Sequence, residues 1–162
     1  MLPTIWRTNM YLKLFGMTKV PLIWLCRPKI IAIDEQHVEV KIPLRRRTKN
    51  HHNSMYFGAL AIGADLAGGF LAMCKAKDRG KHISLVFKGM RAEFLKRPEG
   101  DVHFVCHDGL LIDEMLQTTL KTGERVNEDV AITAFCPSID GQKAMAKFIL
   151  TLSIKAAPSS QS

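Results

Sequence analysis

The chain has 162 residues, of which 47% are hydrophobic and 23% charged, as is typical of one globular domain. Its formal net charge of +8 favours an anionic partner: nucleic acid, an acidic lipid surface or a phosphorylated small molecule. Only 7% of the residues are aromatic and no base-stacking motif accompanies the basic blocks, so a phosphate-bearing small molecule fits at least as well as nucleic acid. Any single basic block could also be a solvated positive surface.

The N-terminal segment has apolar residues at a spacing that predicts an amphipathic helix lying over the body: Ile5, Met10, Leu12, Leu14 and Phe15. A helix on a membrane surface is the alternative. No basic start, apolar block and cleavage site follow one another here, so we predict no signal peptide. Residues 19–28 are apolar and predict a packed connection, which makes 1–28 a helical extension.

Partial alternation predicts two strands over residues 30–44, with Asp34 and Glu35 at a turn and one apolar side: Ile31, Ile33, Val38, Val40 and Ile42. A long apolar helix follows over residues 54–77. Ser54 is a candidate N-cap, and Arg79 with Gly80 predicts the helix end.

The second half of the chain alternates strands with turn signals. We predict a hairpin of strands 83–96 and 102–106, joined at the turn 98–101, and then a helix over 108–122 that ends at Gly123. Two further strands, 130–136 and 144–154, flank the turn 137–141. Residues 156–162 read as a disordered tail, so the main domain is 29–155.

These elements predict an α+β fold. Four or five antiparallel strands cannot bury both of their faces by themselves, and one long apolar helix needs cover on every side. A curved antiparallel sheet wrapped around that helix satisfies both requirements.

Asp65 is the only charged residue between Met55 and Cys74. A carboxylate among so many apolar and small residues is expensive unless it is paired or has a chemical role. The first interpretation is a catalytic acid on an active-site helix, and the second is a structural aspartate bonded to a neighbouring group.

The segment from Asn50 to Asp65, N-H-H-N-S-M-Y-F-G-A-L-A-I-G-A-D, resembles the hotdog-fold acyl-CoA thioesterases of the PaaI-like group, in a poorly characterised thioesterase-like branch. That group has an Asn, a His two places on, a His-Gly-Gly triplet, and an Asp or Glu seven residues after the last Gly. The matching positions here are Asn50, His52, Gly58, Leu60, Ala64 and Asp65. Residues 92–101 and the turn 140–143 extend the resemblance, which covers about 30–155.

The resemblance implies a hotdog fold and thioester hydrolysis. A backbone N–H at the start of the helix, from Phe57 and Gly58, would polarise the thioester carbonyl. Asp65 would act as general base or as nucleophile. The sequence departs from the family at Tyr56 and Phe57, which replace the first two residues of the triplet; Tyr56 stands where a substrate-positioning His is usual, and the bulk of Phe57 narrows the acyl entrance.

Phe57 and Asp65 are eight residues apart, about 12 Å along a helix axis. One chain therefore cannot place both groups on the same carbonyl, and an aspartate from a second subunit is expected. The resemblance likewise implies dimers that share their sites, with a dimer of dimers as a further possibility.

Several residues near the helix start are candidates for substrate binding: Asn50, His52, Asn53, Ser54 and Tyr56. Each of Asn53 and Ser54 could instead be a simple cap, and His52 could order the loop. Lys88 and Arg91 could face the pantetheine or phosphate end of coenzyme A, or lie at a solvated edge. The basic run Arg45 to Arg47 is a further candidate for the nucleotide phosphates.

The four cysteines are widely spaced, form no CxxC pair and lie in apolar surroundings: Cys26, Cys74, Cys106 and Cys136. This pattern predicts reduced thiols in the cytoplasm. His51 and His52 lack acidic neighbours, so we predict no metal and no cofactor. The alternatives to a thioesterase are a non-hydrolytic binder of acyl-CoA or fatty acid, a dehydratase of the same fold, and a nucleic-acid-binding module.

Overall fold

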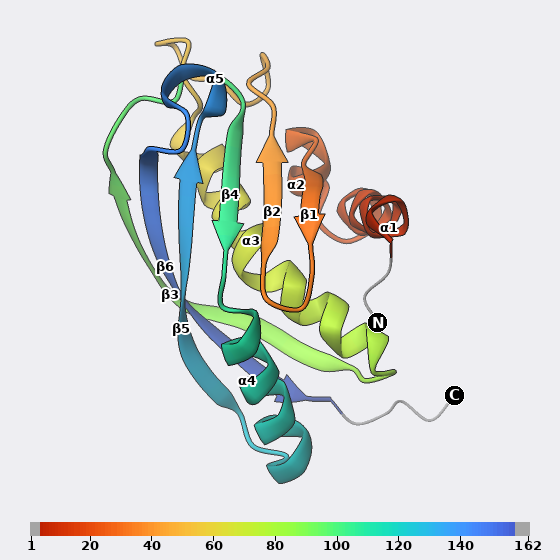
Figure 1. Cartoon of the computed structure of the whole chain (residues 1–162). Helices are drawn as coiled ribbons and strands as arrows, with labels where there is room; N and C mark the ends of the chain where they lie inside the picture. Colours follow the sequence, from red (N-terminus) through yellow and green to blue (C-terminus); the bar gives the residue numbers. More distant parts are fainter. Residues whose placement is uncertain (1–3, 158–162) are drawn as a thin grey trace.

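A six-stranded antiparallel sheet curves around one long helix in the computed structural model, which describes residues 4–157 (Figure 1). The strand order is β1-β2-β4-β5-β6-β3. The strands are β1 (Lys29–Ile33), β2 (Val38–Ile42), β3 (Ile83–Phe94), β4 (Val102–Cys106), β5 (Val126–Phe135) and β6 (Ala144–Ala156). The helices are α1 (Ile5–Thr18), α2 (Pro21–Cys26), α3 (Phe57–Asp78), α4 (Gly109–Thr122) and α5 (Pro137–Asp140).

Helix α3 is the core of the fold, and its small residues let the sheet approach it closely. A Cβ atom on Gly63 would lie 2.2 Å from the Phe104 ring, and one on Gly68 would lie 2.9 Å from Leu150. Among the described helices, α3 is the one long and apolar enough to cross a membrane, but 67% of its apolar stretch is buried inside the protein. It therefore serves as a core helix, as the sequence predicts.

Two predictions about α3 and its neighbours differ from the structure. The helix begins at Phe57 with Tyr56 as N-cap residue, so the N-cap prediction for Ser54 is wrong. Its end at Arg79 and Gly80 is confirmed. The predicted hairpin of strands 83–96 and 102–106 is also wrong, because β3 pairs with β6 at the sheet edge and β4 lies between β2 and β5.

The remaining strands and α4 follow the sequence prediction with one local change. In β1, Ile30 is the buried residue and Ile31 is only half-buried, because the register with β2 shifts between Ile30 and Ala32. A register shift of one residue exchanges the two faces of a strand. Strand β6 ends at Ala156; of the predicted tail, residues 158–162 lie outside the described residues.

The N-terminal helix α1 forms as predicted, but its apolar residues are distributed differently. Its buried residues are Thr8, Leu12 and Gly16, whereas Met10 and Leu14 face solvent. Asn9 ties the helix to the sheet: its side chain donates to the Ile30 carbonyl at 3.0 Å and accepts from the Ile30 N–H at 2.8 Å.

Candidate active site

Helix α3 starts without a side-chain cap. Its first two backbone N–H groups, those of Phe57 and Gly58, donate no hydrogen bond within the described part of the chain. Such groups carry the positive end of the helix dipole and favour a developing negative charge. The helix start can therefore accept an oxyanion.

The loop before the helix is held by its own hydrogen bonds. The Asn50 side-chain oxygen accepts from the His52 N–H at 2.9 Å and from the Ser54 hydroxyl at 3.2 Å. Asn53 adopts a left-handed conformation with φ of 60°, which asparagine tolerates better than most residues. The loop is thus fixed beside the helix start, with Ser54 buried.

A pocket of about 490 Å³ opens between this loop, the helix start and the segment after β3. Its lining includes five of the residues that the sequence analysis proposed for the site: Asn50, His52, Ser54, Tyr56 and Phe57. The other proposed residues do not line it within one chain: Arg45 to Arg47, Asn53, Gly58, Asp65, Lys88 and Arg91.

The far wall of the pocket, residues 94–98, is the part that sequence reasoning missed. The Met55 N–H donates to the Pro98 carbonyl at 2.8 Å, which joins the loop to this wall. Lys96 and Arg97 bring positive charge to the pocket, and Lys96 also pairs with Asp140 at 3.0 Å. The basic pair and Pro98 were visible in the sequence, but the mistaken hairpin separated them from the helix start.

Asp65 lies two turns into α3 and is only partly buried. Within the described residues its carboxylate forms no hydrogen bond or ion pair, which does not support the alternative of a structural aspartate bonded inside its own chain. Desolvation by burial raises the pKa of Asp65 to about 6. A carboxyl with a pKa near neutrality is suited to proton transfer.

One face of α3 is left uncovered by its own chain, and Asp65 is on it. The half-buried residues of this otherwise buried helix fall on that face: Gly58, Ala61, Ile62, Asp65 and Met73. Gly69, one turn beyond Asp65, lies against β3, since a Cβ atom there would be 3.0 Å from the Phe87 ring. Asp65 therefore points to the side of the helix where β3 runs.

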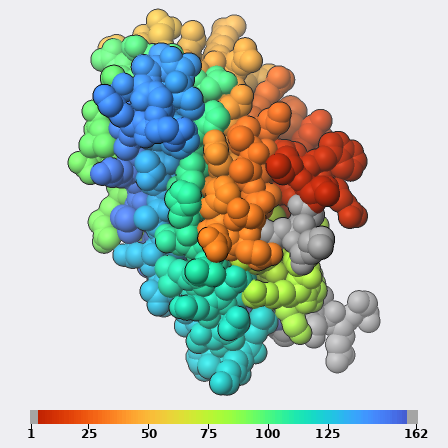
Figure 2. Space-filling view, viewed as in Figure 1, coloured from red at the N-terminus to blue at the C-terminus, as the bar shows by residue number. Residues whose placement is uncertain are grey.

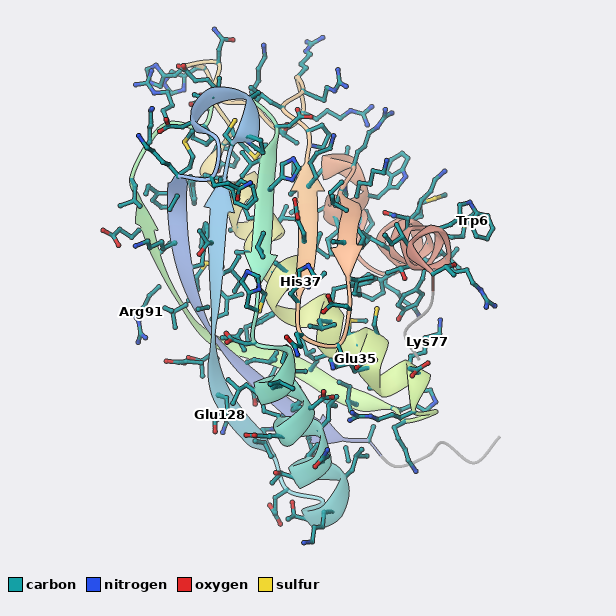
Figure 3. The ribbon with its side chains drawn as sticks, in the orientation of Figure 1. Trp6, Glu35, His37, Lys77, Arg91 and Glu128 are labelled. Carbon is teal, nitrogen blue, oxygen red and sulfur yellow. The ribbon has the colours of Figure 1, made fainter. Side chains whose placement is uncertain are left out.

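Strand β3 is open along that side. All residues from 88 to 94 are exposed, and Met90 and Phe94 share the concave face with their partners on β6, Leu150 and Ala146. Lys88 is the extra residue where the β3–β6 register shifts. Arg91 points away from the body and pairs with Asp129 at 3.2 Å (Figure 3). The apolar side chains and the strand edge together form an exposed surface along β3, on the side of α3 to which Asp65 points.

The two neighbouring imidazoles, His51 and His52, are exposed, with ring centroids 3.9 Å apart. Within residues 4–157, no group of three His, Cys, Asp or Glu side chains is placed to hold a metal ion. The four cysteines are free and buried.

A curved antiparallel sheet around one central helix is the hotdog fold. A protein of unknown function from Chlorobaculum tepidum TLS has this fold with a TM-score of 0.81 at 16% identity, over 95% of this chain and 98% of that one. The chain belongs to the family described as "Domain of unknown function (DUF4442)", which matches residues 8–136.

Two solved structures that carry a thioesterase name are also similar. A thioesterase from Haemophilus influenzae gives a TM-score of 0.71 at 15% identity, over 100% of this chain and 97% of that one. Zebra fish thioesterase superfamily member 2 gives 0.64 at 12% identity, over 96% and 99%. At these identities the comparison establishes the shared fold. No curated protein matches the sequence at a significant level.

Proposed function

We propose that the protein is an acyl-CoA thioesterase whose site combines the start of α3 in one subunit with Asp65 of a second subunit. The observation that carries this proposal is Asp65 itself, an unpaired carboxyl with a pKa raised to about 6 on the uncovered face of α3. The thioesterase names of two structures with the same fold support the reaction class.

The open edge of β3 supports the second subunit. Two β3 strands that pair across a two-fold axis would extend the sheet and cover the exposed residues Met90 and Phe94. The same contact would bring each Asp65 toward the other chain, which removes the obstacle of the roughly 12 Å between Phe57 and Asp65. A dimer is then a condition for catalysis, and two dimers could assemble further.

In the proposed reaction the thioester carbonyl oxygen accepts hydrogen bonds from the N–H groups of Phe57 and Gly58. With Asp65 as general base, the carboxylate takes a proton from water while the water oxygen attacks the carbonyl carbon. The carbon–sulfur bond then breaks, and the thiolate of coenzyme A takes that proton. With Asp65 as nucleophile, its carboxylate attacks the carbonyl carbon, the carbon–sulfur bond breaks and the thiolate of coenzyme A leaves. Water then hydrolyses the acyl-aspartate anhydride, which frees the Asp65 carboxylate and the acid, and the proton released goes to the thiolate.

The pocket next to the helix start would take the acyl end of the substrate. Tyr56 and Phe57 line its apolar side, and Asn50, His52 and Ser54 border it. Asn53 holds the loop that presents them. The phosphates of coenzyme A would meet basic residues near the pocket, for which Lys96, Arg97 and Arg45 to Arg47 are candidates, with Lys88 and Arg91 contributed by the partner chain.

Subunit complementation tests this arrangement. Phe57→Pro removes one N–H donor without breaking the helix, because proline is tolerated at the first helical position and Tyr56 already has the extended conformation that a following proline requires. Asp65→Asn removes the acid. Each variant alone should lose about 10²-fold or more in the rate of acyl-CoA hydrolysis.

Mixed dimers of the two variants distinguish a site shared between subunits from a site built within one chain. If each site uses a donor from one chain and an acid from the other, one of the two sites in every mixed dimer is intact. A statistical mixture should then recover about a quarter of wild-type activity. No recovery in verified mixed dimers would contradict the shared site, and undiminished activity of Asp65→Asn alone would remove Asp65 from the mechanism.

Phe57 supports a second candidate function, because its side chain lines the pocket and is 61% exposed. If its side chain blocks the approach of water, the protein would bind acyl-CoA or fatty acid without hydrolysis. Tight binding of acyl-CoA with no release of free thiol, by wild type and Asp65→Asn alike, would establish that role.

The four free and buried thiols support our proposal of a cytoplasmic location.

A further inference from the structure

The N-terminal helices carry an apolar surface that the proposed reaction does not use. Of the large hydrophobic residues exposed in the described chain, more than half lie between residues 5 and 25. On α1 they form a single stripe of Trp6, Met10, Leu14 and Met17, spaced by four, four and three residues. On α2 the exposed apolar residues are Leu22, Trp24 and Leu25. These seven residues are called here the N-terminal patch.

The stripe is separate from the contacts that hold α1 in place. Helix α1 packs on the body through Thr8, Leu12 and Gly16, which fall on the opposite side of the helix. Trp6 is 71% exposed and points away from the body (Figure 3). Figure 2 shows these helices standing out beside the sheet. Such a continuous exposed apolar surface marks an interaction site.

A pocket of about 790 Å³ lies between α1, α2 and the start of β1, next to the stripe. Trp6, which belongs to the patch, and Lys13, which lies beside it, both line the pocket from α1. Trp24 lines the pocket from α2. The pocket therefore lies between apolar residues of the two helices, and its hollow can receive a hydrocarbon chain.

The charged residues of the segment that carries the patch have one sign. Residues 1–33 contain Arg7, Lys13, Lys19, Arg27 and Lys29 and no Asp or Glu. Arg7 and Lys13 lie on either side of the α1 stripe, are exposed, and form no ion pair within the described residues. Apolar side chains bordered by unpaired cations, with tryptophans among them, fit the boundary between the hydrocarbon and the headgroups of an anionic bilayer.

We infer that the N-terminal patch docks the protein on the surface of an anionic membrane. Helix α1 has 14 residues, about 21 Å in length, too short to cross a hydrocarbon core of about 30 Å. It would lie in the interface with its stripe inserted and Arg7 and Lys13 among the headgroups. Pairing with a second copy is disfavoured, because a two-fold contact would place these cations against each other with no acid in the segment.

The two tryptophans of the chain, Trp6 and Trp24, both belong to the patch. Tryptophan emission of the full-length protein therefore reports this surface directly. We expect a blue shift and co-sedimentation with vesicles of phosphatidylcholine containing about 30% phosphatidylglycerol, and neither effect with phosphatidylcholine alone.

Three exposed-site variants make the test specific. Arg7→Glu with Lys13→Glu should weaken binding to anionic vesicles by about tenfold or more. Met10→Ser with Leu14→Ser should weaken it by a similar factor. Lys121→Glu with Lys155→Glu, the same charge change at exposed residues outside the patch, should have a much smaller effect.

Three results would overturn the inference: no binding to anionic vesicles, equal binding to neutral vesicles, or equal loss in the Lys121 and Lys155 control. A change in oligomeric mass on mutating Met10 and Leu14, without vesicle binding by wild type, would instead assign the patch to a contact between copies. None of these measurements depends on hydrolysis, so the inference stands or falls separately from the proposed reaction.

Discussion

The Lys75 ammonium lies 2.7 Å from the Asp113 carboxylate, inside the protein, with only 2% of the lysine exposed. Glu35 contacts the same ammonium at 2.9 Å, and Arg79 contacts Asp113 at 2.6 Å. The four charges join the end of α3 to α4 and to the turn between β1 and β2. A buried cation of this kind is tolerated because it is paired on two sides.

Removing Asp113 should therefore destabilise the protein strongly. We expect Asp113→Ala to lower the free energy of unfolding by about 3 kcal/mol, because the buried Lys75 would keep Glu35 as its remaining partner. Urea denaturation followed by circular dichroism measures the change. Arg91→Ala, which breaks the exposed pair with Asp129 and leaves the Asp129 bond to the Thr151 hydroxyl in place, is the control and should cost about 1 kcal/mol or less.

Gly63 should not accept even one methyl group. In Gly63→Ala the added carbon would collide with the Phe104 ring, and we expect a loss of about 1–3 kcal/mol in the free energy of unfolding despite the better helix propensity of alanine. Phe104→Leu should restore part of this loss in the double variant. Simple additivity of the two single changes would show that the ring is not the cause.

The stability of the protein should depend on pH through Asp65. Its pKa is about 6 in the fold and 3.8 in a free side chain, so the folded state binds the proton more tightly. The stability from this proton is present below pH of about 4 and is lost as pH rises through about 6. Asp65→Asn should thus be more stable than wild type by about 1–3 kcal/mol at pH 8 and nearly equal to it at pH 4. A constant difference across this range would contradict the burial of the carboxylate.

The rate of hydrolysis should also depend on the ionisation of Asp65. Activity should increase over the pH range in which stability decreases. Both proposed roles of Asp65 need the ionised carboxylate, so kcat/KM should rise with pH and level off above about 6. A stopped assay with an acyl-CoA over the acid range measures this profile. A pH-independent rate in the same range would assign the chemistry to another group.

Dimerisation should fail when a charge is placed on the open face of β3. Met90→Asp is expected to convert the proposed dimer to a monomer, measured by light scattering, and to abolish hydrolysis with it. Leu110→Asp introduces the same charge at an exposed residue of α4 and should change neither. A monomeric wild type with full activity would contradict the shared site.

The sequence predicts the parts of this fold that depend on local patterns. The apolar run of α3, its end at Gly80, the helix α4 with Gly123 after it, and the final strand pair are all confirmed. The partner of β3 could not be predicted, because a turn such as 98–101 signals a change of direction and does not specify which strand follows in the sheet. The wall of the pocket at residues 94–98 was missed for the same reason.

The sequence likewise predicts only part of the candidate site. The solitary charge of Asp65 is visible in the sequence, and so is the polar loop before the helix. The surroundings that give Asp65 its raised pKa depend on how α3 and β3 lie against each other. Similarly, the spacing of Met10 and Leu14 predicts a helix but does not reveal that they face outward, because α1 is apolar on two sides.

The side-chain amide of Asn9 affects which edge of the sheet can pair with a strand of another chain. The Asn9 side chain bonds both the N–H and the C=O of Ile30, so neither group is free to pair with another strand at the β1 edge of the sheet. Addition of a further strand is therefore less favoured at β1 than at β3, where the proposed two-fold pairing would occupy the free edge of each chain. If that pairing forms, strand addition stops at two chains, which disfavours open-ended fibres.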